Sequence, residues 1–250
     1  MATASAAAHA ASGPPRAHRL VRLFADTIGR KSVVAVTGGL IILFLLGHLA
    51  GNLLIFRGQD AINEYAHRLK SNPIYPLLWV ERVGMLGVFL LHVIGTITLT
   101  RRNRAVRPVR YEMWVPSRST VAGRYMALSG LVILAFVVFH LLHFTLGVVD
   151  HSNTSLDLLD SAGRRDVYSA LVGSFHNPWI VLSYIVAIGL LGMHLRHGIS
   201  SAFQTIGVHT ANDSRIVKTV MLAIVGFLVI GNWAIPLMVL FGKIPYAGGM

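Results

Sequence analysis

Five long apolar segments constrain the fold of this chain more than any other feature of its sequence. Each is long enough to cross the roughly 30 Å hydrocarbon core of a bilayer as a helix, which takes about 20 residues. Of the 250 residues, 54% are hydrophobic and 13% are charged, and the mean hydropathy is +0.62, as is typical of membrane proteins. The expected membrane-spanning helices cover residues 32–56, 76–100, 123–149, 178–200 and 217–241.

The expected fold class is therefore an all-α membrane protein with five transmembrane helices. The first fifteen residues are rich in alanine and lack the basic start of a signal peptide. We expect residues 1–31 to form an N-terminal tail and amphipathic lead-in, residues 32–241 the transmembrane domain, and residues 242–250 a short C-terminal tail.

The basic residues are unevenly distributed between the two sides of the membrane. Fifteen of the 22 Lys and Arg residues lie in segments that would share the side of the N-terminus, and six lie on the other side. By the positive-inside rule the N-terminus is expected in the cytoplasm. This topology explains the formal charge of +12 without a nucleic-acid partner.

Four histidines lie deep inside four of the apolar segments, at depths that match in pairs. His48 and His140 lie about three quarters of the way along segments that run outward, and His92 and His194 lie at the same place in segments that run inward. An imidazole at membrane depth is costly unless it has a partner, so these residues are functional candidates. Axial ligation of two haems, one pair of histidines to each, explains the pattern most economically.

The chemistry of the side chains fits such a site. Imidazole is a good ligand for haem iron, and two axial histidines leave no open position, which favours electron transfer. The chain has no cysteine, which excludes thiolate-held iron–sulfur clusters, disulfides and covalent C-x-x-C-H haem attachment within it. Any haem would be held by histidine and packing alone.

The two halves of the chain resemble each other. The spacing of Phe44 and His48 recurs in Phe136 and His140, and the loops at residues 57–73 and 163–178 both carry apolar residues at helical spacing. That spacing predicts a short interfacial helix in each loop. We expect two helical hairpins in parallel repeat, forming a four-helix haem-binding bundle with the fifth helix at its flank.

Two of the candidate ligands are followed three residues later by another histidine. His143 follows His140 and His197 follows His194, in each case still near the same helix face. The repeat favours His140 and His194, although alignment on Pro73 would favour His197. Because such pairs can chelate one ion, a His-lined metal transporter or non-haem metal enzyme is an alternative, with few carboxylates available to complete its site.

Several motifs together resemble those of one known family. They are Phe44 to Asn52 around His48, the loop from Arg57 to His67, Leu91-His92, Phe139-His140, and the run from His194 through Ser201-Ala202-Phe203 to Gly207. The chain resembles the cytochrome b membrane anchor of succinate:menaquinone oxidoreductases and fumarate reductases, in the single-polypeptide, five-helix, di-haem form. A cytochrome b subunit of another quinone-linked dehydrogenase would share the haem pairing but not the last motif.

The resemblance implies two haem b groups, an inner one held by His92 and His194 and an outer one held by His48 and His140. It also implies a bacterial plasma membrane, a flavoprotein and an iron–sulfur subunit on the cytoplasmic face, and menaquinone as the electron partner, with no succinate site in this chain. A higher oligomer of the whole complex is compatible with it. Fumarate reductases that move a compensating proton carry a glutamate two positions before the fourth-helix ligand, where this chain has Gly192.

Candidates for the remaining functions are weaker. A quinone needs hydrogen-bond donors in an apolar cleft, and haem propionates need cations. The quinone-site candidates are Arg30, Lys31 and Ser32 on the inner side and Glu64, Tyr65 and His67 on the outer side. The propionate candidates are Arg101, Arg102 and Arg124.

Overall fold

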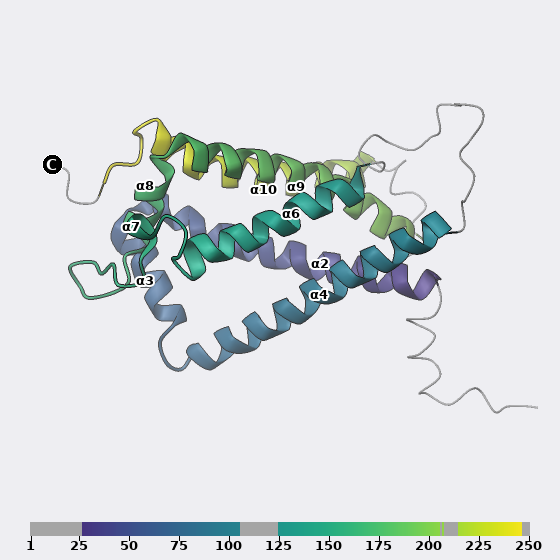
Figure 1. Cartoon of the computed structure of the whole chain (residues 1–250), viewed down its shortest axis with the longest axis horizontal. Coiled ribbons are helices and arrows are strands. Elements are labelled where there is room, and N and C mark those ends of the chain that lie inside the picture. The colour runs from purple at the N-terminus through teal and green to yellow at the C-terminus, as the bar shows by residue number, and fades with distance from the viewer. Residues whose placement is uncertain (1–26, 106–124, 206, 208–214, 247–250) are drawn as a thin grey trace, which may run out of the picture.

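The computed structural model describes residues 27–105, 125–205, 207 and 215–246, and every regular element in this part of the chain is a helix (Figure 1). Five helices are long and apolar enough to cross a membrane, as the sequence predicts. They are α2 (Thr27–Asn52), α4 (Tyr75–Ala105), α6 (Met126–His140), α9 (Pro178–Thr205) and α10 (Arg215–Leu240). Residues 1–26, most of the expected N-terminal tail, and residues 247–250, the last part of the expected C-terminal tail, lie outside the described residues.

The third span is shorter than the segment predicted at residues 123–149. After α6 the chain forms one π-helical turn, η2 (Leu141–Thr145), and then leaves the helix. Gly147 has a φ of 63°, in the left-handed region that commonly ends helices. The carbonyl of Phe144 accepts a bond of 2.9 Å from Arg165 Nη2, which satisfies a carbonyl of the final turn.

The short helices predicted in the two outer loops are both present. They are α3 (Gln59–Leu69) and α8 (Val167–Phe175), accompanied by the one-turn helix α7 (His151–Thr154). The first follows α2 through a 3-10 turn, η1 (Leu53–Arg57). Asp166 caps α8 by accepting a bond of 3.0 Å from the backbone of Ser169, because its carboxylate satisfies a free N–H of the first turn.

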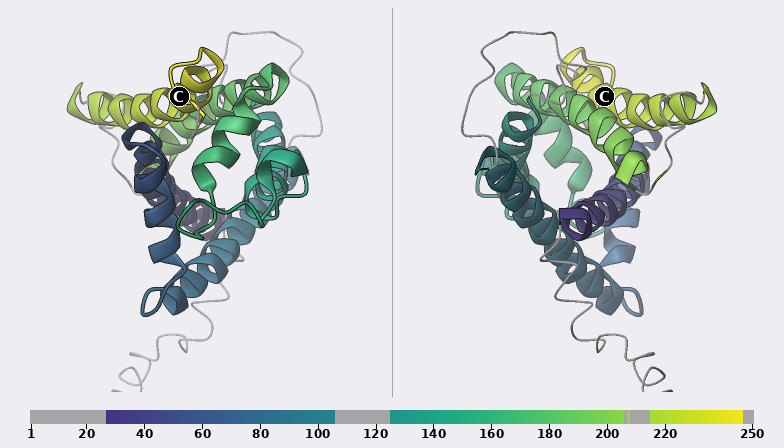
Figure 2. Two further views of the ribbon diagram at one scale, coloured as in Figure 1. Left: turned by 90° about the vertical axis from the view of Figure 1, so that its left-hand side faces the viewer. Right: turned by 90° about the vertical axis from the view of Figure 1, so that its right-hand side faces the viewer.

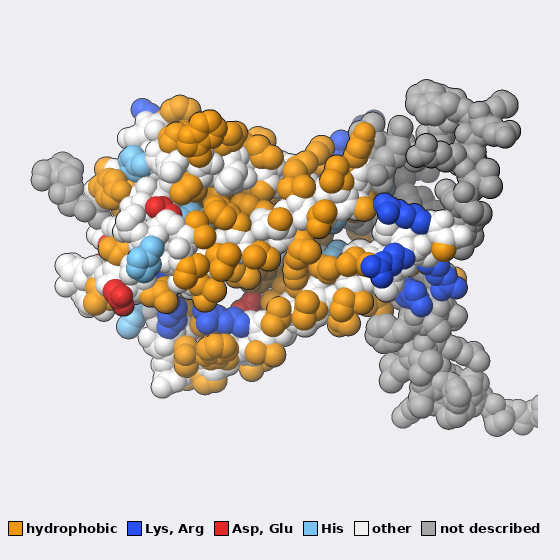
Figure 3. Space-filling model, viewed as in Figure 1, with side chains coloured by type: hydrophobic (Ala, Val, Ile, Leu, Met, Phe, Trp, Pro, Cys, Tyr) orange, Lys and Arg blue, Asp and Glu red, His pale blue; other side chains and the backbone are white. Residues whose placement is uncertain are grey.

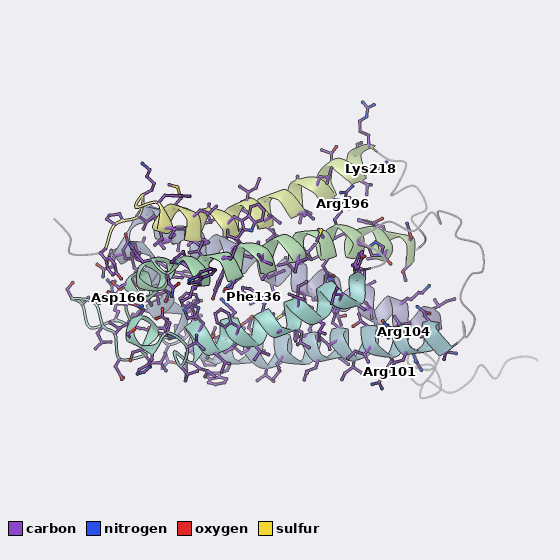
Figure 4. The ribbon with its side chains drawn as sticks, turned by 45° about the horizontal axis from the view of Figure 1, so that its top comes forward. Arg101, Arg104, Phe136, Asp166, Arg196 and Lys218 are labelled. Carbon is purple, nitrogen blue, oxygen red and sulfur yellow. The ribbon has the colours of Figure 1, made fainter. Side chains whose placement is uncertain are left out.

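The five long helices run alongside one another, and α3, α7 and α8 gather at one end (Figures 1 and 2). We call this the capped end and the opposite one the arginine end, where Arg101, Arg104 and Arg196 lie (Figure 4). In the four-helix bundle, α2 packs against α4 and α9, and α6 packs against α9 and lies beside α4. Helix α10 packs on α9 and α2 from outside the bundle.

Packing is dense on one side of this bundle and sparse on the other. The main apolar cluster joins α8, α9, α10 and η1, and includes the fully buried Val172 and Val239. In contrast, none of the 31 residues of α4 is buried. The face of α4 that looks into the bundle, which carries His92, is therefore not closed by close-packed side chains.

Candidate functional site

Each helix of the four-helix bundle carries one of the four candidate histidines, and the fold brings them together in the expected pairs. Near the capped end, the ring centroids of His48 and His140 are 5.9 Å apart and the ring planes meet at 89°. Each of these imidazoles stacks on the phenyl ring four residues before it. The centroid distances are 5.5 Å for Phe44 with His48 and 6.1 Å for Phe136 with His140.

Toward the arginine end, His92 of α4 and His194 of α9 lie within electrostatic reach of each other. Each is hydrogen bonded through Nδ1 to a hydroxyl of a neighbouring helix. Thr37 Oγ1 lies 3.2 Å from His92 Nδ1, and Ser129 Oγ lies 3.2 Å from His194 Nδ1. Both hydroxyl residues are buried.

The hydrogen-bond pattern favours one protonated ring nitrogen in His92 and His194. Thr37 donates its only hydroxyl proton to the carbonyl of Val33 at 2.7 Å, and Ser129 donates to the carbonyl of Met126 at 3.1 Å. Each hydroxyl can therefore only accept from the imidazole, so Nδ1 is the donor. A neutral imidazole then has an unprotonated Nε2, which is the form that binds a metal ion.

Thr37 and Ser129 contact the candidate histidines but were not singled out from the sequence. They are separated by 92 positions, the same offset that relates Phe44 to Phe136. The next residues repeat as well: a Cβ atom on Gly38 would lie 3.4 Å from His92 Cε1, and one on Gly130 would lie 3.5 Å from His194 Cε1. Extending the repeat seven residues toward the N-terminus would have found both hydroxyls.

His143 differs from all four of these histidines. Its side chain is fully buried, at 0% exposure, and its ring stacks on Phe144 at a centroid distance of 4.0 Å. Both ring nitrogens are hydrogen bonded: Nδ1 lies 3.0 Å from Tyr184 Oη and Nε2 lies 3.1 Å from Ser174 Oγ. His140 is bonded through Nδ1 alone, at 3.2 Å from Tyr184 Oη, which leaves its Nε2 available.

His197 lies one helical turn beyond His194, next to Arg196 and closer to the arginine end (Figure 4). The hydroxyl of Ser129 contacts the imidazole of His194, and a Cβ added at Gly130 would lie 3.5 Å from its Cε1. The hydroxyl and the glycine that correspond to Thr37 and Gly38 in the repeat therefore lie beside His194 and not beside His197.

The quinone-site candidates form two separate groups at opposite ends of the molecule. Arg30, Lys31 and Ser32 lie in the first turns of α2 at the arginine end. On α3, the carboxylate of Glu64 is bound by Arg68 at 2.7 Å and by Arg164 at 3.0 Å.

The other two candidates on α3 face different surroundings from Glu64. Tyr65 packs against Gly51 of α2, where an added Cβ would lie 2.6 Å from the Tyr65 ring, and His67 is exposed. Of the three residues, Tyr65 is therefore the one in contact with the helix that carries His48.

The propionate candidates Arg101 and Arg102 lie near the end of α4, at the arginine end. Arg124 lies outside the described residues. Figure 3 shows one group of Lys and Arg side chains at this end, others toward the capped end, and apolar side chains over the middle of the molecule. The acidic residues of the described ranges all lie toward the capped end, so the two ends differ in charge.

Arg164 organises the charges of the capped end. Its guanidinium lies 2.7 Å from Asp60, 3.0 Å from Glu64 and 2.8 Å from Asp160. Burial raises the pKa of Asp160, but bonds from the backbone and side chain of Arg164, and from Asn63, outweigh it and hold that pKa at about 2. Bonds from Arg68 and then Arg164 lower the pKa of Glu64.

Gly192 faces the fifth long helix. A Cβ there would lie 2.6 Å from Val229 Cγ2 of α10. A larger side chain at this position would collide with α10, so Gly192 serves the close packing of α9 on α10.

No family model, curated protein or solved structure matches this chain. The chemical assignment therefore depends on the geometry of the histidines. The ring centroids of His48 and His140 are 5.9 Å apart, which is a direct contact within the range usual for pairs of aromatic rings.

Proposed function

We propose that this chain is the haem b-binding membrane anchor of a bacterial succinate:quinone oxidoreductase, with its N-terminus and its arginine end in the cytoplasm. The observation that carries the proposal is the set of four partly exposed histidines, paired at two levels of one helical bundle. Three of them are bonded through Nδ1 to a hydroxyl, so their Nε2 atoms are available as ligands.

His92 and His194 would hold the inner haem, and His48 and His140 the outer one. When bound, such haems would supply one-electron transfer between an iron–sulfur subunit and membrane menaquinone. No residue of α4 is buried, and Gly38 and Gly130 let their helices lie close to the imidazoles of the inner pair.

The protein groups around the histidines have defined tasks in this proposal. Thr37 and Ser129 hold the imidazoles of the inner pair in the tautomer and orientation that ligation requires. Phe44 and Phe136 stack on the outer pair and limit its rotation.

The charge distribution supports the proposed partners. A basic cytoplasmic face, which includes Arg101, Arg104 and Arg196, would receive the iron–sulfur and flavoprotein subunits. Menaquinone would react near the outer haem, and Tyr65 is the best-placed candidate donor because it packs on α2 one turn beyond His48.

Purification of the chain after expression with a haem supply tests the proposal. We expect two b haems per chain, measured as the pyridine haemochrome, and a reduced-minus-oxidised spectrum of low-spin cytochrome b. Protein that purifies with zinc or non-haem iron and no haem would refute the assignment and favour the metal-transporter alternative.

The partner subunits separate this proposal from the other cytochrome b alternative. Expressed in its native membrane, the tagged chain should co-purify with a flavoprotein and an iron–sulfur subunit, and the complex should reduce menaquinone with succinate. Co-purification with a hydrogenase or a formate dehydrogenase would identify another quinone-linked enzyme.

A further inference from the structure

A continuous chain of hydrogen bonds links His140 to a carboxylate at the capped end. Tyr184 Oη lies 3.2 Å from His140 Nδ1 and 3.0 Å from His143 Nδ1. His143 Nε2 lies 3.1 Å from Ser174 Oγ, and Ser174 donates to Asp150 Oδ2 at 2.8 Å. The chain uses residues of α6, η2, α8 and α9, so the tertiary fold assembles it.

The direction of every bond follows from the donor at the far end. Ser174 gives its only hydroxyl proton to Asp150, so it must accept from His143 Nε2. The ring of His143 is fully buried, and the nearest carboxylate oxygen lies 3.9 Å away, beyond hydrogen-bond distance, which favours the neutral ring. Its Nδ1 is then an acceptor.

The bonds of Tyr184 determine the protonation of His140, the candidate ligand. Tyr184 must donate its proton to His143 Nδ1, so it can only accept from His140. His140 therefore carries its proton on Nδ1 and presents an unprotonated Nε2 to the bundle. Asp150 and Tyr184, which are 34 positions apart in the sequence, are thus both linked by hydrogen bonds to the imidazole of His140.

We propose that Tyr184, His143, Ser174 and Asp150 are positioning residues that orient His140 and extend the negative charge of Asp150 to it. This inference rests on the proposed function, because it concerns the metal bound at His140 Nε2. A ligating histidine whose other N–H faces a carboxylate, directly or through a chain, is a stronger electron donor. The oxidised form of the outer haem should be stabilised, and its reduction potential lowered.

The series of hydrogen bonds ends at the carboxylate of Asp150, which is itself held by hydrogen bonds. Asp150 has a φ of 54°, and both of its carboxylate oxygens accept bonds from Asn153 Nδ2, at 3.0 and 3.1 Å. The aromatic side chains of Phe136, Phe139 and Phe175 surround Tyr184 and keep the middle of the chain apolar. Phe136, which also stacks on His140, is labelled in Figure 4.

The substitution Tyr184→Phe tests the inference because it removes one hydroxyl and retains the ring. Tyr168→Phe is the matched control, since the Tyr168 hydroxyl donates to the carbonyl of Pro245 outside the chain of bonds. Asp150→Asn is a second variant that removes the charge, and asparagine tolerates the positive φ. Redox titration of the purified full-length protein, followed by haem absorption, gives the two midpoint potentials.

We expect Tyr184→Phe to raise the reduction potential of the outer haem by about 59 mV. For a one-electron couple this corresponds to a change of about tenfold in the ratio of oxidised to reduced haem at a given potential. Asp150→Asn should shift the potential of the outer haem in the same direction, and Tyr168→Phe should leave it unchanged. The shifted haem should be the one that His48→Gln removes. Two retained haems with unchanged potentials in both test variants would overturn the inference.

A second measurement does not depend on haem. Nitrogen NMR of ¹⁵N-histidine-labelled, haem-free protein reports which ring nitrogen of His140 is protonated, with His140→Gln used to assign the signal. We expect the Nδ1–H form in the native sequence and a change in Tyr184→Phe. The Nε2–H form in the native sequence would overturn the inference, whereas a wild-type chain that binds no haem would refute only the proposed function.

Discussion

The two histidine pairs of this protein differ in how the surrounding structure holds them. In the pair toward the arginine end, His92 and His194 each bond to a hydroxyl that in turn bonds to a carbonyl of its own helix, and His92 also bonds to the backbone of Val34. The pair toward the capped end is asymmetric, because His140 is connected to Asp150 through other side chains and His48 makes ring contacts with Phe44 and His140.

The difference shows what an internal repeat preserves. The repeat places equivalent residues around His92 and His194, because their partners lie on the equivalent helices α2 and α6. Near the capped end the two loops differ in length and structure: the counterparts of α8 and η2 are α3 and η1, but the bonds that lead away from His140 use His143 of η2 and Ser174 of α8. Two sites with the same ligands can therefore have different electrostatic surroundings.

The largest expected effect is the loss of a haem when a ligand is replaced. His194→Gln should remove the inner haem and leave one haem per chain, while the neighbouring substitution His197→Gln should leave two. The pyridine haemochrome measures both. Loss of the outer haem in His194→Gln would contradict the assignment of the pairs to the two levels.

The same comparison applies near the capped end. His140→Gln should remove the outer haem, whereas His143→Gln should retain it, because both nitrogens of His143 are already bonded within the protein. Loss of a ligand abolishes a site, but loss of a positioning residue weakens it by about 10- to 100-fold. A His143→Gln protein with one haem and a His140→Gln protein with two would reverse the choice between them.

The next largest effect is expected from crowding of the inner pair. Gly38→Leu places a branched side chain against His92, because even a Cβ there lies 3.4 Å from the imidazole. Overpacking of this kind costs about 1–3 kcal/mol, which should weaken binding of the inner haem roughly tenfold or more. Occupancy during titration with haemin measures the change.

Gly39→Leu is the matched control for this substitution, since an added Cβ there meets no atom within 4 Å. Both variants add the same residue to the same turn of α2. Equal loss of haem in the two would show that the leucine acts on the helix rather than on the site.

The lengths of the apolar segments predicted the five spans, helical spacing predicted the two loop helices, and the depths of the histidines predicted that His48 and His140 lie together. The predicted end of the third span was wrong because most residues from Leu141 to Val149 are apolar, and composition does not show that Gly147 adopts a positive φ there. The roles of Tyr184, Ser174 and Asp150 could not be predicted from spacing. Their contacts join segments that are distant in sequence and depend on how α8 packs on the bundle.

A smaller effect is expected at the capped end when the pH falls. Because the pKa of Asp160 is about 2 in the folded protein and 3.8 ordinarily, its ionised form stabilises the fold. This contribution is complete above the ordinary value and is lost as the pH falls through about 2. Between pH 5 and pH 2 we expect the loop around Asp160 to separate from α3.

The absence of cysteine allows this separation to be measured with two introduced labels. Spin labels at His67→Cys and Asp157→Cys, both exposed positions, report the distance between α3 and the loop. Arg164→Gln should broaden that distance distribution already at pH 7 and flatten its pH dependence. A distribution that is narrow at pH 2 in both proteins would show that Arg164 does not hold the two segments together.

The smallest effect is expected from the hydroxyls of the inner pair. Thr37→Val keeps the shape of the side chain and removes its bond to His92, and Thr96→Val is the control, since Thr96 bonds only to the carbonyl of Val93 in its own helix. The Thr37 hydroxyl is neutral and its proton is already used, so it adds less electron density to the imidazole than a carboxylate does. The inner potential should rise by less than the tenfold ratio, about 59 mV, expected for the outer haem in Tyr184→Phe. An equal or larger shift in Thr37→Val would mean that the hydrogen bond to the imidazole sets the potential of both haems. The negative charge of Asp150 would then have no separate effect on the outer haem.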